Sequence, residues 1–285
     1  METGKKLSII RGHRSKKNHV NGHTDEILAC AICPTDSNLA ASGGRDKVIK
    51  LWDLRTAASS GPIGELSGHF GDITGLCFQL GTQNLFSSSL DRTVKVWDFV
   101  EQSFVETLYG HEAEVLGVDA LHSYRVLSCS SDHTVRLWKV EEETQLLFKS
   151  HKQNIDCVKM LRENIYVSAG QSGNIHVFNR AKRKPMYTFT NTGDAIDKQS
   201  GKNLGWISGL AAVQYSDMFM ASSDYGHVDF YSMDSGFIKR LPIPSHNGSS
   251  HEFKGWVNGM CADFQKETQT LTVVGISSNE HRLGR

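Results

Sequence analysis

Three sets of side chains in this sequence could, by residue type, perform nucleophilic catalysis. Each set combines a histidine, a serine and an aspartate with a tryptophan, at matched offsets along the chain. A serine, a histidine and an aspartate form the triad in which histidine takes the serine proton and aspartate orients the histidine. The sets are His23, Ser42, Asp46 and Trp52; His69, Ser87, Asp91 and Trp97; and His111, Ser128, Asp132 and Trp138.

The repetition of the set favours a structural role over a catalytic one. A triad is built once, around one substrate pocket, whereas this set recurs along the chain. We interpret it as a buried hydrogen-bond chain from Asp through His and Ser to the Trp indole, which satisfies each polar group. A fourth copy keeps His151 and Ser168 but has Ser172 and Phe178 in the Asp and Trp positions. We therefore expect no catalytic residue and no enzymatic activity.

The elements that position these sets repeat at intervals of roughly 40 to 50 residues, a period typical of propeller blades. Six three-residue segments, called stations below, each consist of a β-branched residue, any residue and then a small one. They are Ile27–Ala29, Ile73–Gly75, Val115–Gly117, Ile155–Cys157, Ile207–Gly209 and Val257–Gly259. The 3.6-residue periodicity of helical repeats is absent. The sequence predicts an all-β propeller with six legible blades, most of a seven-bladed ring.

Each repeat is expected to contain four short strands. The segments Val48–Trp52, Thr93–Trp97 and Thr134–Trp138 alternate polar and apolar residues, which predicts half-buried strands. The small residue at the third place of each station is expected where the strands crowd one another. In the last two repeats Trp206 and Trp256 precede the station and the polar set is lost, so packing must hold these repeats together.

The whole chain, residues 1–285, is interpreted as one propeller domain. The expected blades span residues 23–66, 69–108, 111–148, 151–189, 206–241 and 256–285, with an orphan outer strand at residues 5–11. Residues 190–205 and 242–255 are expected to be connectors. Either Lys6–Ile10 closes the sixth blade or the chain is a fragment of a seven-bladed ring, and we favour the fragment.

Composition excludes several classes of function. The 31 Lys and Arg residues balance 31 Asp and Glu residues, so affinity for nucleic acid requires local patches. The sequence has no signal peptide and no apolar run long enough to span a membrane, which predicts a soluble intracellular protein. Cys30 and Cys33 are expected to be buried core thiols rather than half of a zinc site. No metal, cofactor, membrane or small-molecule substrate is expected.

The repeat residues carry a family resemblance. Gly-His openings and Trp-Asp closings resemble WD repeats over nearly all of the chain. A narrower resemblance is to the WD-repeat family of the U3 small nucleolar ribonucleoprotein, a box B/C-binding propeller family. It rests on Phe104–Val115, Val118–Leu121, Ser150–Cys157 and Glu280–Arg285.

The resemblance implies a non-catalytic RNA-binding and scaffold component of that particle, in the nucleus and nucleolus, acting in small-subunit ribosomal RNA processing. It implies three kinds of partner: the box B/C element of the U3 small nucleolar RNA, a small RNP protein that binds kink-turns, and other processome proteins. The alternative left open is a protein-only scaffold or substrate adaptor that binds a peptide on its top face.

Basic residues near the connectors and the Asp-bearing turns are the candidate RNA contacts, because Lys and Arg release counterions from phosphate. The first set is Arg11, Arg14, Lys16, Lys17, Arg45, Lys47, Arg92, His281, Arg282 and Arg285, with His133 on the same rim. A second basic patch, expected on the opposite face, comprises Arg180, Lys182, Arg183 and Lys184.

Overall fold

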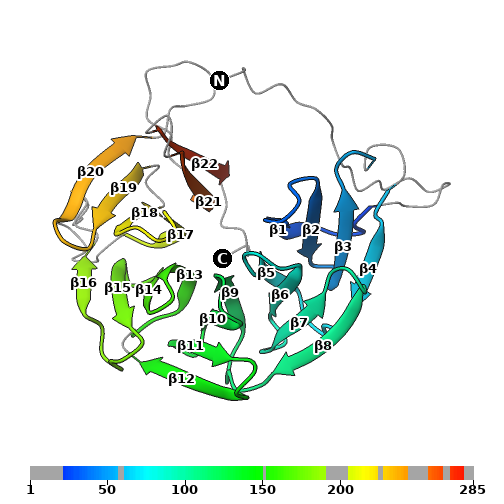
Figure 1. Ribbon diagram of the computed structural model, residues 1–285. Helices are drawn as coiled ribbons and strands as arrows, with labels where there is room; N and C mark the ends of the chain where they lie inside the picture. Colours follow the sequence, from blue (N-terminus) through cyan, green and yellow to red (C-terminus); the bar gives the residue numbers. More distant parts are fainter. Residues whose placement is uncertain are drawn as a thin grey trace. The chain divides into compact units, whose positions relative to one another are not determined.

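The part of the chain that the computed structural model describes is built of β-strands, turns and loops (Figure 1). It comprises residues 22–56, 61–149, 152–190, 205–223, 227–242, 256–265 and 270–278. No α-helix occurs in these segments, in agreement with the predicted all-β class, and no helix that could span a membrane is found among them. The chain divides into two compact units, Met1–Val115 and Leu116–Arg285.

The first unit contains two four-stranded antiparallel sheets, in which neighbouring strands follow one another in sequence. The first sheet consists of β1 (Ile27–Ile32), β2 (Leu39–Gly44), β3 (Val48–Asp53) and β4 (Gly64–Ser67). The second consists of β5 (Ile73–Phe78), β6 (Asn84–Ser89), β7 (Val94–Asp98) and β8 (Ser103–Leu108).

The second unit contains three four-stranded sheets and one hairpin, and its first strand begins at the last residue of the first unit. The first sheet has β9 (Val115–Ala120), β10 (Arg125–Ser130), β11 (Thr134–Lys139) and β12 (Thr144–Lys149). The next has β13 (Ile155–Arg162), β14 (Ile165–Gly170), β15 (Asn174–Asn179) and β16 (Tyr187–Thr190). The last sheet has β17 (Ile207–Ala212), β18 (Met218–Ser223), β19 (His227–Ser232) and β20 (Gly236–Pro242). The hairpin pairs β21 (Trp256–Gln265) with β22 (Thr270–Ser278).

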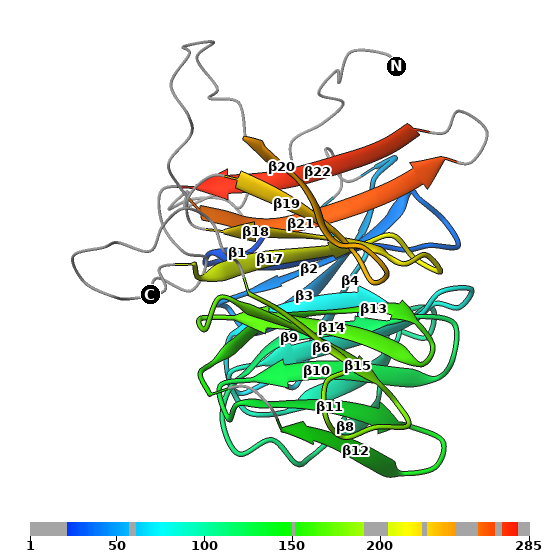
Figure 2. The same cartoon turned by 90° about the vertical axis from the view of Figure 1, so that its left-hand side faces the viewer.

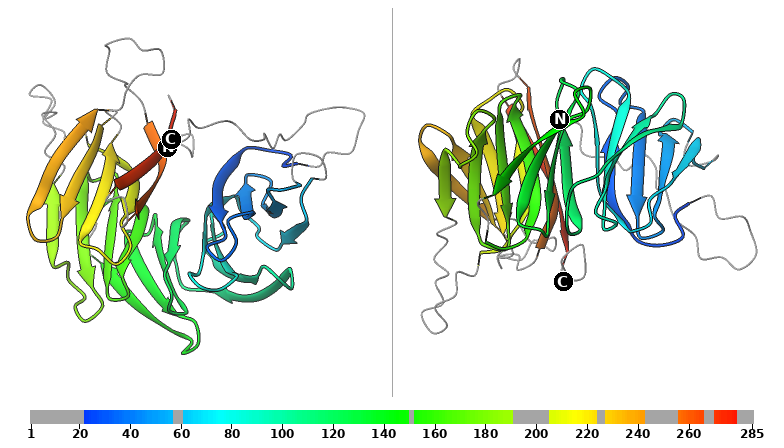
Figure 3. Two further views of the ribbon diagram at one scale, coloured as in Figure 1. Left: turned by 45° about the horizontal axis from the view of Figure 1, so that its top comes forward. Right: turned by 90° about the horizontal axis from the view of Figure 1, so that it is seen from below.

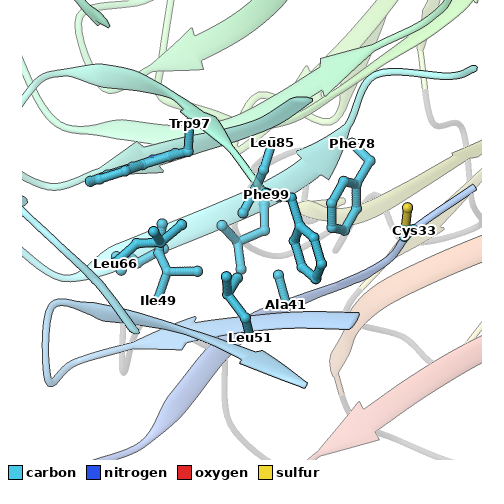
Figure 4. Close-up of a cluster of buried hydrophobic side chains, with 11 residues drawn as sticks. Cys33, Ala41, Ile49, Leu51, Leu66, Phe78, Leu85, Trp97 and Phe99 are labelled. Atoms are coloured by element: carbon cyan, nitrogen blue, oxygen red, sulfur yellow. The ribbon is translucent and has the colours of Figure 1, made fainter. Parts of the chain in front are cut away.

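A continuous apolar core joins the two sheets of the first unit. Figure 4 shows Ala41, Ile49 and Leu51 of the first sheet facing Leu85 and Phe99 of the second. The rings of Phe78 and Phe99 meet edge to face at 5.5 Å, a favoured aromatic geometry. Burial of this cluster holds the two sheets together.

In the second unit the sheets stack face against face. Figure 2 shows the β21–β22 hairpin next to the β17–β20 sheet, and Figure 3 shows the same stacking from two further directions. Met220 of β18 and Met260 of β21 are buried in the shared core. On the other side of β17–β20, Phe219 and Tyr231 stack at 5.3 Å and are buried with residues of the β13–β16 sheet. Apolar packing therefore links the β17–β20 sheet to both of its neighbours in this unit.

The stations of the sequence repeat coincide with irregularities in the first strand of a sheet. The pairing register shifts between Ile27 and Ala29, and similar shifts occur at the stations that begin with Ile73, Ile155, Ile207 and Val257. A Cβ added at Gly117 would lie 3.1 Å from the Cys129 sulfur, which explains the small residue there. A Cβ added at Gly259 would meet no atom within 4 Å, so crowding does not explain the small residue at every station.

The prediction of half-buried strands is wrong for β3, β7 and β11. Their polar residues are buried as well as their apolar ones, Lys50, Lys95 and Arg136 among them. The fourth strand of the sheet explains this burial at Lys95. Its Nζ donates to Thr107 Oγ1 of β8 at 2.6 Å and lies 4.9 Å from the centre of the Phe104 ring. A long basic side chain can thus be buried along its stem while its head group stays paired.

The prediction for the cysteine pair is also wrong in one respect, because Cys33 is buried but Cys30 is exposed. No cluster of metal-ligating side chains occurs in the described segments, Cys30 and Cys33 included. The predicted strand at residues 5–11 lies outside the described residues, as do the predicted connectors except at their ends.

Candidate nucleic-acid interface

The predicted chain of hydrogen bonds is present in both sheets of the first unit. In the first sheet, His23 Nδ1 lies 2.7 Å from Asp46 Oδ2 and its Nε2 lies 2.7 Å from Ser42 Oγ. Trp52 Nε1 donates to the same Ser42 oxygen at 2.7 Å. The set therefore ties β2, β3, the turn between them and the connector before β1 into one hydrogen-bonded unit.

The second set repeats this geometry. His69 lies 2.7 Å from both Asp91 Oδ2 and Ser87 Oγ, and Trp97 Nε1 donates to Ser87 Oγ at 2.8 Å. Burial by itself would raise the pKa of Asp91. Hydrogen bonds from His69 and Thr93, the charge of His69 and the Phe70 N–H together hold that pKa well below its usual 3.8.

The distances within these sets resemble those of a catalytic triad, but the serine is not available to a substrate. The side chain of Ser87 is fully buried, and its oxygen is already engaged by His69 and Trp97. A nucleophile must reach the reacting carbon, which this position prevents. The geometry supports the structural interpretation.

Several corresponding residues of the third and fourth repeats are also buried. Trp138 Nε1 donates to Ser128 Oγ at 2.8 Å, and His111 is buried. In the next repeat Ser168 and Phe178 are fully buried, while His151 lies outside the described residues.

The residue that follows each turn aspartate has a positive φ. The φ angles are 63° at Lys47, 70° at Arg92 and 64° at His133, and a glycine, Gly173 with 68°, occupies the position in the fourth repeat. Only the left-handed conformation continues the turn there, and non-glycine residues adopt it at some cost. All three side chains are exposed, so the turn presents a cation or an imidazole to solvent.

Three of the first set of candidate RNA contacts lie in the described part of the chain. Lys47 and Arg92 are exposed, whereas Arg45 is half-buried and its Nε lies 3.1 Å from Glu26. The end of β2, directly before the turn that carries Lys47, lies against the start of β5, because a Cβ at Gly43 would meet the Ile73 side chain at 2.8 Å. The other candidates of this set lie outside the described residues: Arg11, Arg14, Lys16, Lys17, His281, Arg282 and Arg285.

The second basic patch lies in the turn between β15 and β16. Lys182, Arg183 and Lys184 are exposed and Arg180 is half-buried. The Arg180 N–H donates to the Asn164 carbonyl at 2.9 Å, which fixes the start of the turn against the β13–β14 turn. The turn therefore presents three adjacent cations to solvent.

Sequence reasoning missed the polar contacts between neighbouring sheets of the second unit. Asp119 of β9 accepts hydrogen bonds from Lys159 Nζ at 2.7 Å and from the Met160 N–H at 2.8 Å. Trp206 Nε1 donates to the buried Asp156 in the same way. Because these pairs join residues of different repeats, no pattern within a single repeat predicts them.

Sequence reasoning also missed two exposed aromatic side chains at the end of the sheet that carries Arg92. Phe70 follows the histidine of the second set and is 87% exposed, and Tyr109 follows β8 and is 73% exposed. The available signal was an aromatic residue next to Gly68-His69 and another next to Gly110-His111.

Known proteins resemble this chain over most of its length. The model of the WD domain, G-beta repeat, matches residues 14–53, 60–98 and 102–139. The chain is 33% identical over 290 residues to the U3 small nucleolar RNA-interacting protein 2 of Homo sapiens, covering 100% of this chain and 58% of that protein. It is 25% identical over 336 residues to the Ribosomal RNA-processing protein 9 of Saccharomyces cerevisiae, covering 94% and 56%.

A solved structure described as "Structure of U3-55K" matches with a TM-score of 0.78 and 30% sequence identity, covering 93% of this chain and 77% of that chain. The chain spans less than three fifths of the length of the two curated relatives. The predicted all-β WD-repeat propeller class is thereby confirmed.

Proposed function

This chain belongs to the WD-repeat family of the U3 small nucleolar ribonucleoprotein, and we propose that it is a non-catalytic RNA-binding and scaffold component of that particle. The observation that carries the proposal is the similarity to U3-55K and to a U3 small nucleolar RNA-interacting protein over nearly the whole chain. Because a propeller supports many functions, the site must supply the rest of the argument.

The cations presented by the turns after the aspartates support an RNA-binding role. Lys47 and Arg92 are exposed at the ends of adjacent sheets of the first unit, and the fold fixes both turns through the buried hydrogen-bond chains. Each Lys or Arg that contacts a phosphate releases condensed counterions, which gives affinity without a net positive charge on the protein. The proposed contacts also include Arg45 and the basic candidates outside the described residues.

The proposed partners are the box B/C element of U3 small nucleolar RNA, a kink-turn-binding small RNP protein and other processome proteins. The proposed location is the nucleolus, and the proposed process is the maturation of small-subunit ribosomal RNA. One relative is named a Ribosomal RNA-processing protein, which supports this assignment. The absence of catalysis is supported by the buried serines, which act as links in the blades.

Charge reversal with a salt titration tests the proposal. The affinity of the purified chain for a short box B/C RNA is measured at several salt concentrations. The Lys47→Glu/Arg92→Glu variant should weaken binding and lower the slope of log K against log salt by roughly 1.4, since each single-strand phosphate contact contributes about 0.7. Arg183→Glu/Lys184→Glu tests the second basic patch in the same way.

Lys239→Glu is the matched control, because Lys239 is exposed on β20 and belongs to neither basic set. It should leave affinity and salt slope unchanged. Absent binding, or binding that does not change with salt in the unaltered protein, refutes the RNA-binding role and favours the protein-only scaffold.

A further inference from the structure

Phe70 and Tyr109 are the two most exposed large apolar side chains in the described part of the chain. Burial of an aromatic ring is strongly favourable, so two rings held in solvent at one edge of a sheet need a reason. Both rings lie at the same end of the strands of the β5–β8 sheet, as the strand register shows.

The strand register places three positions at one end of the sheet. Ile73, which follows the Phe70 connector, pairs with Ser89 at the end of β6. Val94, which follows the Arg92 turn, pairs with Leu108 at the end of β8. Tyr109 comes directly after Leu108. Phe70, Arg92 and Tyr109 therefore all lie at the end of the sheet that carries the β6–β7 turn.

The backbone that carries Phe70 is held in place although its ring is exposed. The Phe70 N–H donates to Asp91 Oδ2 at 2.9 Å, and the same carboxylate oxygen lies 2.7 Å from His69. A Cβ added at Gly71 would lie 2.6 Å from the Asp91 N, so the connector packs directly on the turn. The ring is thus presented by a fixed backbone, which lowers the entropy lost on binding a ligand.

Arg92 is fixed in the same way. It follows Asp91, its φ is 70° and its side chain is exposed. The carboxylate of Asp91 is engaged by His69, Thr93 and the Phe70 N–H, and points into these hydrogen bonds. Arg92 is therefore the cation that the β6–β7 turn presents to a ligand at this end of the sheet.

We propose that Phe70 and Tyr109 stack on unpaired bases of RNA while Arg92 contacts the adjoining phosphate. The proposal rests on the RNA-binding function proposed above and assigns its base-contacting residues. Proteins read single-stranded RNA by stacking splayed bases on aromatic rings and Arg planes, together with a basic track for the backbone.

The test separates stacking from general apolar contact. Dissociation constants of the full chain are measured for a box B/C RNA and for a fully paired duplex of the same length, with wild type, Phe70→Leu, Phe70→Trp and Tyr109→Leu. Leucine keeps an apolar side chain but removes the planar ring. Phe70→Leu and Tyr109→Leu should each weaken binding to the box B/C RNA about 5- to 150-fold, the range for one lost base stack.

The same variants should leave duplex binding and the salt slope unchanged, because stacking releases no counterions, and Phe70→Trp should bind as well as wild type. Val100→Ala is the control, since Val100 is exposed at the opposite end of the same sheet. If wild type binds the RNA and both leucine variants bind it equally well, the stacking proposal is refuted while the RNA-binding function stands. If wild type fails to bind, the proposed function itself is refuted.

Discussion

Removal of the Trp97 side chain tests whether the recurring His-Ser-Asp-Trp set is structural. Trp97 is 1% exposed and its indole donates to Ser87 Oγ at 2.8 Å. It also meets the Phe104 ring edge to face at 5.6 Å. Replacing a fully buried Trp with Ala costs about 3–5 kcal/mol, which includes the cavity that remains. The melting temperature of Trp97→Ala should therefore fall by roughly 6–20 °C.

Trp97→Phe separates packing from the hydrogen bond. Phenylalanine fills most of the space, as Phe178 does in the fourth repeat, but removes the N–H that reaches Ser87. The expected loss is smaller, about 1–3 kcal/mol, and comes from one hydrogen bond and a small cavity. Both variants are measured by denaturant unfolding, with Val100→Ala as an exposed control expected to change stability by less than about 0.5 kcal/mol. A loss below about 1 kcal/mol for Trp97→Ala would show that the set does not hold the sheet.

Two further predictions concern buried charge. Because the pKa of Asp91 is lowered in the folded protein, its contribution to stability is present above the usual pKa of 3.8 and is lost as pH falls toward the lower folded value. In acid denaturation curves the stability of Asp91→Asn should therefore depend less on pH below about 4 than that of the wild type. The same pH dependence in both proteins would contradict this. Arg240 pairs with the buried Asp229 at 2.7 and 2.8 Å, so Arg240→Met should cost about 3–5 kcal/mol, with Asp229→Asn/Arg240→Met restoring part of the loss. Equal stability of Arg240→Met and wild type in urea titration would argue against the pair.

Sequence alone predicted the hydrogen-bond set because its residue types and offsets repeat. Repetition of the set distinguishes a structural serine such as Ser87 from a nucleophile on the sequence alone. The β7 strand shows the limit of the same approach. Alternation in Thr93–Trp97 predicted one exposed face, but Lys95 is buried because Thr107 and Phe104 of the next strand cover it. An alternating pattern does not report whether a polar face is covered by a neighbour.

The candidate site was predictable only in part for a related reason. Lys47 and Arg92 could be identified because they follow a repeated aspartate. Phe70 has no aromatic counterpart in the other repeats, so the repeat pattern did not mark it, and its place next to Gly68-His69 was the one available signal. The Asp119–Lys159 pair joins strands of different sheets, and a single sequence contains no information on which non-local partners meet.

The most direct test of the central claim is the affinity of the purified chain for a short box B/C RNA as a function of salt. The account predicts binding whose logarithmic salt slope falls by roughly 1.4 in Lys47→Glu/Arg92→Glu and is unchanged in Lys239→Glu. RNA binding that is absent, or that shows the same salt slope in both variants and in wild type, would contradict it.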